Sequence, residues 1–253
     1  MKPCILITAY QLVDYVELNI QRIRNEYKLL NDVEIVIVST SEVDVGYKEM
    51  VEKYEKVHLI EFPDAPKYEA IYYDNGYEPP SMNVGISLTK RIFLSMEKGL
   101  KKLDSLGCNI CLHLHGDTYW DSKKEKNLYN ILKEVYDGDL LFSGDLWDHD
   151  PNSGLDRYTL FHPQGLVIHI PNSKKYNFIE FNKIWNSSFV SKNYGSSEML
   201  IGEYAEFCLS GKILKNEGEK HSEIYYKKVK VRDIIPHHGE FESGIVNFNI
   251  KQR

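Results

Sequence analysis

The sequence predicts an α/β fold with a mixed, mostly parallel central sheet flanked by helices. Short apolar runs rich in β-branched residues occur at 5–8, 33–38 and 57–62. Between them, apolar residues recur at spacings of three and four, which is typical of one helix face. Between 140 and 170 strand-like runs follow one another with turn residues in place of helices, which indicates an antiparallel portion of the sheet.

The first half of the chain alternates strands with helices that are long enough to cross over between parallel neighbours. Pro63, Pro66, Pro79 and Pro80 mark the stretch 63–81 as a loop over the domain. The expected elements are a strand at 5–8, a helix with Val16, Ile20, Ile23, Tyr27 and Leu30 on its apolar face, a strand at 33–38, a short helix at 47–54, a strand at 57–62, a helix at 83–103 and a strand at 109–114.

The second half has a different rhythm. A helix with Leu128, Ile131, Leu132 and Val135 on one face comes first. The later expected elements are strands at 140–143, 158–161 and 165–170, a helix at 196–210 and a strand within 223–249. No repeat or linker divides the chain, so we expect a single domain over 1–253.

Composition excludes several classes of protein. The 31 Lys and Arg residues against 37 Asp and Glu give a formal charge of −6, and no long basic block is present to bind nucleic acid. No apolar run approaches the roughly 20 residues of a transmembrane segment, and the apolar start is too short for a signal peptide, so we expect a cytoplasmic protein. Four cysteines lie among apolar neighbours, and Cys108 and Cys111 lack a second pair for zinc, so we expect buried free thiols.

The segment CLHLHGDTYWDS at 111–122 is the strongest candidate site, because it holds two histidines and two aspartates within twelve positions at the end of an apolar strand. Ligands of parallel sheets gather beyond the carboxyl ends of the strands, where Asp117 is expected. Its carboxylate is a suitable ligand for Mg²⁺ or Mn²⁺, although it also suits a turn or helix cap. His113 and His115 share one side of the strand, and His113 also fits a hydrogen-bonded core position.

The order of these segments, with His115-Gly116-Asp117 after the strand at 109–114, resembles a GT-A type nucleotide-sugar glycosyltransferase. In that family an acidic motif, often written DxD, holds a divalent metal and the diphosphate of the sugar nucleotide. The resemblance places Asp117 at the acidic position, and His115 occupies the place of the first acidic residue. It implies Mn²⁺ or Mg²⁺ as cofactor, with His115 and either His237 or His238 near the carboxyl end as further ligands.

The resemblance also implies where the nucleoside binds. Thr8 and Tyr10 match the end of the first strand, where Tyr10 would either stack on the base or pack on the first helix. Ser39 matches the exit of the second strand, where relatives commonly place an aspartate. Asn83, at the start of the long helix, would reach the donor, whereas Lys90 and Arg91 either reach it or lie on a solvated helix face.

Glu198, within YGSSEMLIGE, resembles the family's carboxylate at the start of a helix near the acceptor. It would act as general base toward an acceptor hydroxyl, or serve only the electrostatics of the helix start. The implied activity is sugar transfer from a nucleoside-diphosphate sugar to a glycan or similar acceptor in polysaccharide biosynthesis. Residues 1–122 would form the nucleotide-binding half and 123–253 the acceptor-side half.

Three other functions remain open. A metal-dependent hydrolase would use His113, His115 and Asp117, although Thr118 stands where that motif has a histidine and the chain opens with crossover units. A GT-A-like domain that only binds a nucleotide or glycan is the second. A nucleotidyltransferase is the third, but no glycine-rich basic phosphate loop occurs at 8–15.

Overall fold

The computed structural model describes residues 1–65, 82–116, 122–144, 165–178, 180 and 226–228. Within them the strands form a seven-stranded sheet in the order β3-β2-β1-β4-β6-β5-β7, which confirms the predicted mixed α/β class. The elements are β1 (Pro3–Ala9), α1 (Val13–Glu26), β2 (Glu34–Ser39), α2 (Tyr47–Val51), β3 (Val57–Glu61), α3 (Met82–Ser105), β4 (Ile110–His115), a short 3-10 helix (Ser122–Lys124), α4 (Glu125–Asp137), β5 (Phe142–Gly144), β6 (Val167–His169), α5 (Ile170–Lys175) and β7 (Tyr226–Lys228).

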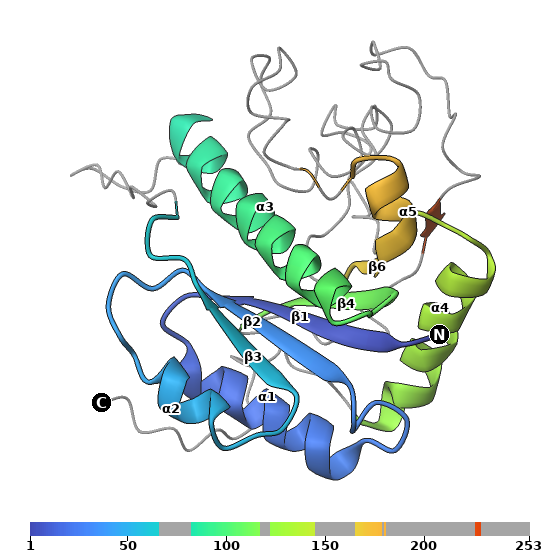
Figure 1. Ribbon diagram of the computed structural model, residues 1–253, viewed down its shortest axis with the longest axis horizontal. Coiled ribbons are helices and arrows are strands. Elements are labelled where there is room, and N and C mark those ends of the chain that lie inside the picture. Colours follow the sequence, from blue (N-terminus) through green and yellow to red (C-terminus); the bar gives the residue numbers. More distant parts are fainter. Residues whose placement is uncertain (66–81, 117–121, 145–164, 179, 181–225, 229–253) are drawn as a thin grey trace, which may run out of the picture.

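The parallel part of the sheet consists of β3, β2, β1 and β4. β1 is parallel to β2 on one side and to β4 on the other, and β3 extends the sheet beyond β2. The helices α1 and α2 lie on one face, whereas α3 crosses the opposite face (Figure 1). Between β3 and β4 the chain crosses to the other face of the sheet, and the order in which strands are added reverses its direction. β1 and β4 therefore flank a topological switch point.

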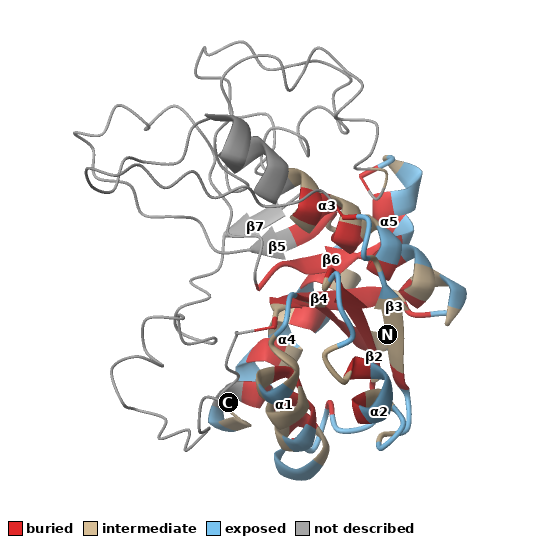
Figure 2. Ribbon diagram, turned by 90° about the vertical axis from the view of Figure 1, so that its left-hand side faces the viewer, coloured by how far each residue is buried: buried red, intermediate tan, exposed pale blue. Residues whose placement is uncertain are grey.

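Two apolar cores lie on the two faces of the sheet. Alternate residues of β1 divide between them: Cys4 and Leu6 pack with α3, and Ile5 and Ile7 pack with α1. The buried strands consequently lie between helices on both faces (Figure 2). Burial on both faces explains why the parallel strands are continuous apolar runs.

Close approach of α3 to β1 depends on Gly99. A Cβ atom there would lie 2.1 Å from Cδ1 of Leu6, so any side chain would push the helix away from the sheet or displace Leu6. Further along α3, Phe93, Met96 and Leu100 form the apolar ridge expected from their spacing.

The second half adds the antiparallel portion, because β6 pairs antiparallel with both β4 and β5. The strand expected at 165–170 was predicted too long, since it ends at His169 and Ile170 begins α5. The backbone N–H of Asn172 donates to Nδ1 of His169 over 3.2 Å, and Pro171 in the first turn has no N–H that needs a partner. The strand expected at 158–161 and the helix expected at 196–210 lie outside the described residues.

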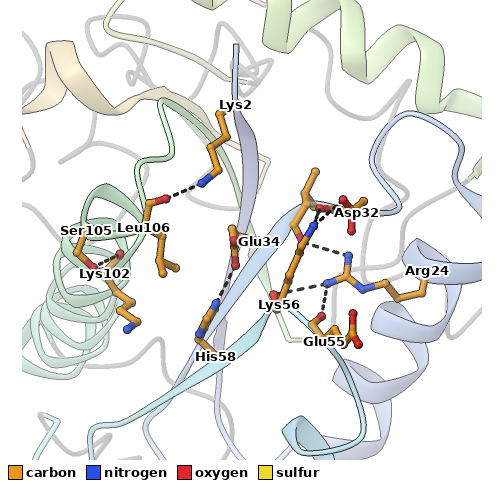
Figure 3. Close-up of polar contacts among 11 residues, drawn as sticks. Lys2, Arg24, Asp32, Glu34, Glu55, Lys56, His58, Lys102, Ser105 and Leu106 are labelled. Atoms are coloured by element: carbon orange, nitrogen blue, oxygen red, sulfur yellow. Dashed lines mark hydrogen bonds and ion pairs between the residues drawn. The ribbon is translucent and has the colours of Figure 1, made fainter.

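The amino-terminal edge of the sheet is held by side-chain contacts to backbone. The guanidinium of Arg24, near the end of α1, donates to the carbonyls of Asn31 and Val33 before β2 and of Glu55 and Lys56 before β3. Figure 3 shows Arg24 between these chain segments. This edge is thus closed by internal contacts, and the opposite, carboxyl edge carries the candidate site.

Cys4, Cys108 and Cys111 are buried free thiols, as expected, whereas Cys208 lies outside the described residues. Burial raises the pKa of the Cys4 thiol well above its usual value, which makes it a poor nucleophile. Among the described residues, no helix has both the length and the apolar character needed to cross a membrane.

Candidate active site

The candidate site lies at the carboxyl ends of β1, β2 and β4, beside the switch point of the sheet. The strand register places Thr8 of β1 opposite Val38 and His115, and Ala9 opposite Ser39. The sequence-predicted residues Thr8, Ser39 and His115 are therefore brought to one edge by three strands. Crevices beyond this edge are where open α/β sheets bind ligands.

A polar layer extends from the sheet toward α3 at this edge. Thr8 and His113 are hydrogen bonded, with Oγ1 and Nε2 3.0 Å apart. The ring of His115 lies edge-on to that of His113, with 5.4 Å between centroids. His113 has 0% of its surface exposed, whereas His115 is half-buried.

These contacts give the two histidines different roles. The imidazole of His113 is a hydrogen-bonded core group that supports Thr8. This agrees with the hydrogen-bonded core position that the sequence allowed for His113. Its Nε2 is engaged with Thr8 and its side chain is fully buried, which argues against the hydrolase that requires His113, His115 and Asp117. Of the two histidines, only His115 keeps part of its surface exposed, and its Nε2 is buried.

Gly116 brings the ends of β4 and β1 close together. Its N–H donates to the carbonyl of Thr8 over 2.9 Å, and a Cβ on Gly116 would lie 2.8 Å from Cβ of Ala9 and 3.2 Å from Cγ2 of Val16. Only glycine fits without displacing these atoms. The strand exit that leads to Asp117 is thereby fixed against the end of β1.

The loop after β1 presents an aromatic ring. Tyr10 is 42% exposed, and the guanidinium carbon of Arg91, from α3, lies 5.1 Å from the centroid of its ring. The side-chain amide of Gln11 donates to the Tyr10 hydroxyl over 3.2 Å. An exposed ring held in this way is suited to stacking on a planar ligand.

The loops after β1 and β2 are joined. The N–H of Gln11 donates to Oγ of Ser41 over 2.9 Å, and the N–H of Thr40 donates to the carbonyl of Ala9. Gln11 has a positive φ of 49°, which turns the chain sharply after Tyr10. Ser39 is 4% exposed, and its hydroxyl accepts from the N–H of Ser41 at 3.4 Å. Sequence reasoning did not single out Gln11 or Ser41, although polar residues just after two adjacent strands were a usable signal.

Several predicted site residues cannot be placed with this group. Asn83 belongs to the first turn of α3, but its side chain lies outside the described part. Asp117, Glu198, His237 and His238 also lie outside the described residues. Within the described ranges, no three His, Cys, Asp or Glu side chains gather in a geometry that holds a metal ion. Of the expected ligands, only His115 is placed at the edge.

No family model matches this chain, and no curated protein matches it. Solved structures do match. An active-site mutant of LgtC has a TM-score of 0.51 at 11% identity, covering 79% of this chain and 70% of that one. Mouse xyloside xylosyltransferase 1 has a TM-score of 0.51 at 8% identity, covering 90% of this chain and 85% of that one.

A mannosyltransferase from Pyrobaculum calidifontis in complex with GDP-Man and Mn²⁺ is also similar, at 14% identity over 69% of this chain. The chain spans only 46% of that protein, and a TM-score of 0.43 supports no argument about this one. The structural similarity to LgtC and the xylosyltransferase establishes the fold of this chain. Because the sequence identities are only 11% and 8%, it establishes nothing more. The chain therefore has the GT-A type fold of nucleotide-sugar transferases that its sequence resembles.

Proposed function

We propose that this protein is a glycosyltransferase that moves a sugar from a nucleoside-diphosphate sugar to a hydroxyl of a glycan or similar acceptor. The observation that carries the proposal is the exposed ring of Tyr10 above Arg91, beside Thr8 and His115 at the switch point of a GT-A fold. An aromatic platform next to polar groups is what a nucleotide requires, since the base stacks and the ribose and phosphates form hydrogen bonds.

In this proposal the first half of the chain, 1–122, binds the donor. Tyr10 stacks on the base, Thr8 contacts the nucleoside, Ser39 shapes the exit of β2, and Asn83 reaches the donor from the start of α3. Thr8 is supported for this role by His113, whose imidazole fixes the position of the hydroxyl. The joined loops after β1 and β2 keep the platform in place before the nucleotide arrives, which lowers the ordering cost of binding.

Asp117 would hold Mn²⁺ or Mg²⁺, with His115 and His237 or His238 completing the ligand set. Carboxylate and imidazole together suit Mn²⁺, and the half-buried His115 lies next to the Gly116 turn that leads to Asp117. A bound cation would neutralise charge on the departing diphosphate. The protein's own part is to orient these ligands, and the tight contact of Gly116 with Ala9 serves that purpose.

The second half, 123–253, would supply the acceptor side. Glu198 is proposed as the general base that takes the proton from the acceptor hydroxyl as its oxygen attacks the anomeric carbon. This role applies if the reaction inverts the configuration at that carbon. The non-catalytic alternative, a GT-A-like domain that binds nucleotide or glycan, shares the donor site but needs no base.

The proposal is tested first by binding. UDP-, GDP-, CMP- and dTDP-sugars are screened by thermal shift with and without Mn²⁺, because a ligand of the native state raises the melting temperature according to its concentration over its affinity. We expect one base to raise it, and more so with Mn²⁺. If all of these donors leave the melting temperature unchanged, the proposal is wrong.

Two variants then separate donor binding from transfer. Asp117→Asn should abolish transfer while leaving the thermal melt nearly unchanged, and Glu198→Gln should abolish transfer while retaining donor binding. Asp32→Asn is the matched control, because its carboxylate lies at the amino-terminal edge of the sheet in an exposed ion pair with Lys56. Binding of a donor by a wild-type protein that transfers no sugar would favour the non-catalytic alternative.

A further inference from the structure

Arg91 is a charged residue buried beneath an exposed aromatic ring. Only 8% of Arg91 is exposed, compared with 42% of Tyr10 above it. The guanidinium carbon lies 5.1 Å from the ring centroid, within the range of a cation–π contact. Burying most of an arginine carries a desolvation cost, and the cation–π contact with the Tyr10 ring offsets part of that cost.

The ring of Tyr10 is held from two directions. Arg91 of α3 covers one face, and the side-chain amide of Gln11 donates to the hydroxyl. Gln11 is itself anchored by its N–H to Ser41 in the neighbouring loop. The partly exposed Tyr10 ring therefore has its orientation fixed before any ligand binds.

We propose that Arg91 is a positioning residue that holds the Tyr10 ring ready to stack on the base of the bound nucleotide. This inference rests on the proposed function, since it needs a nucleotide at Tyr10. It differs from both sequence-based interpretations of Arg91, the solvated helix face and the direct contact to the donor. Arg91 acts through the ring in this proposal, because the residue as a whole is only 8% exposed and its guanidinium lies over Tyr10.

Without the guanidinium, the Tyr10 ring loses one cation–π contact and has to be ordered when the nucleotide binds, so nucleotide affinity should fall. Removing the guanidinium should weaken nucleotide binding about three- to tenfold. Arg91→Met removes the charge and keeps an unbranched apolar chain of similar reach. Arg91→Lys keeps the charge but lacks the planar group that stacks on the ring, so its affinity should lie between those of the wild type and Arg91→Met.

The test is a double-mutant cycle on nucleotide affinity. UDP, GDP, CDP and dTDP, each with Mn²⁺, are titrated calorimetrically into the wild type, Arg91→Met, Tyr10→Ala and the double variant. If Arg91 acts through Tyr10, Arg91→Met weakens binding in the wild type but has no further effect once the ring is absent. If the two losses multiply, Arg91 contacts the nucleotide directly and the proposal is overturned.

Lys98→Met is the matched control. Lys98 lies on the same helix and places its ammonium 4.5 Å from the centroid of the Phe62 ring, so the variant also removes a cation–π contact of α3. Lys98 is exposed, and we expect nucleotide affinity to stay at the wild-type value. An equal loss in Lys98→Met and Arg91→Met would show a general effect of charge or of α3, and would overturn the specific role of Arg91.

A second readout needs no nucleotide. In protein labelled with fluorotyrosine, the ¹⁹F resonance missing from Tyr10→Phe identifies Tyr10, and Arg91→Met should shift or broaden that resonance while the others stay in place. An unchanged Tyr10 resonance would overturn the positioning role whether or not a nucleotide binds. Failure of all four nucleotides to bind the wild type would instead remove the proposed function, and the stacking role of Tyr10 with it.

Discussion

Gly116 shows how one residue without a side chain fixes the geometry of the site. We expect Gly116→Ala to lower the free energy of unfolding by about 1–3 kcal/mol, the usual cost of forcing a methyl group into packed surroundings. The added Cβ would lie 2.8 Å from Cβ of Ala9, so the ends of β4 and β1 would have to separate. Chemical denaturation monitored by circular dichroism measures the loss.

A compensating change identifies the cause of that loss. Ala9→Gly removes the atom that Gly116→Ala would strike, so the double variant should recover stability relative to Gly116→Ala alone. Ala9→Gly by itself should cost only about 0.5–1 kcal/mol from chain entropy. Strictly additive losses would mean that the contact between Gly116 and Ala9 is not what requires glycine.

His169 predicts a dependence of stability on pH. Burial lowers the pKa of His169 from the usual value of 6.5, and the nearby Asp139 opposes this only in part. Its Nδ1 accepts from the N–H of Asn172, and its ring lies 5.5 Å from that of Tyr136. Protonation of Nδ1 would place a second donor against that N–H, so the native state favours the neutral ring.

Because the native state binds the proton less tightly than the unfolded chain, stability is fully present above pH 6.5 and is lost as pH falls through the lowered pKa. We expect the free energy of unfolding to decrease on acidification, and His169→Asn to make that decrease shallower. Asparagine still caps α5 but does not titrate. Denaturation curves from about pH 8 to about pH 5 compare the two proteins. Identical slopes would exclude His169 as a contributor.

At the scale of elements, Glu125 joins two parts of the chain that are far apart in sequence. Its carboxylate, in the first turn of α4, accepts from the consecutive N–H groups of Lys28, Leu29 and Leu30, with distances of 2.7 to 3.0 Å. Glu125 is only 7% exposed. These charge-assisted bonds hold the turn between α1 and β2 against the start of α4.

Glu125→Gln should therefore destabilise the protein by about 1.5–3 kcal/mol, because it removes the charge and turns an amide donor toward backbone donors. Asp137→Asn, at the other end of α4, is the control: its carboxylate is 57% exposed and 4.0 Å from Lys133, a pair expected to contribute about 0–0.5 kcal/mol. Urea denaturation of both variants gives the difference. Equal effects would mean that the turn at 28–30 does not depend on the carboxylate.

The elements were predictable where periodicity is strong and the connection is local. The parallel strands and α3 follow from apolar runs and helical spacing, and Thr8 and His115 follow from their places at strand ends. α5 was missed because Ile170 continues an apolar run, although Pro171 was a signal of a helix start. The contacts of Glu125 and Arg91 were not predictable, since they join segments whose proximity arises only from the fold.

In the whole molecule, the order of strands separates protected inner strands from the outer strand β3. β1 has β2 and β4 as neighbours and is covered by helices on both faces, whereas β3 is an edge strand within the described residues. The middle residues of β3, His58, Leu59 and Ile60, are half-buried, while five of the seven residues of β1 are buried. The candidate site lies next to β1, so it is built on an enclosed part of the sheet.

This arrangement predicts a gradient of local stability that native-state hydrogen exchange can measure. Amides of β1 and β4 should exchange only when the whole domain unfolds, and their opening free energy should equal that from denaturation. Amides of β3 that point away from β2 should exchange through local opening, with protection at least about tenfold lower. Because the site depends on β1, nucleotide binding should raise protection of β1 and its following loop more than that of β3. Uniform protection across both strands would contradict the view that the site is supported by a rigid centre and a looser edge.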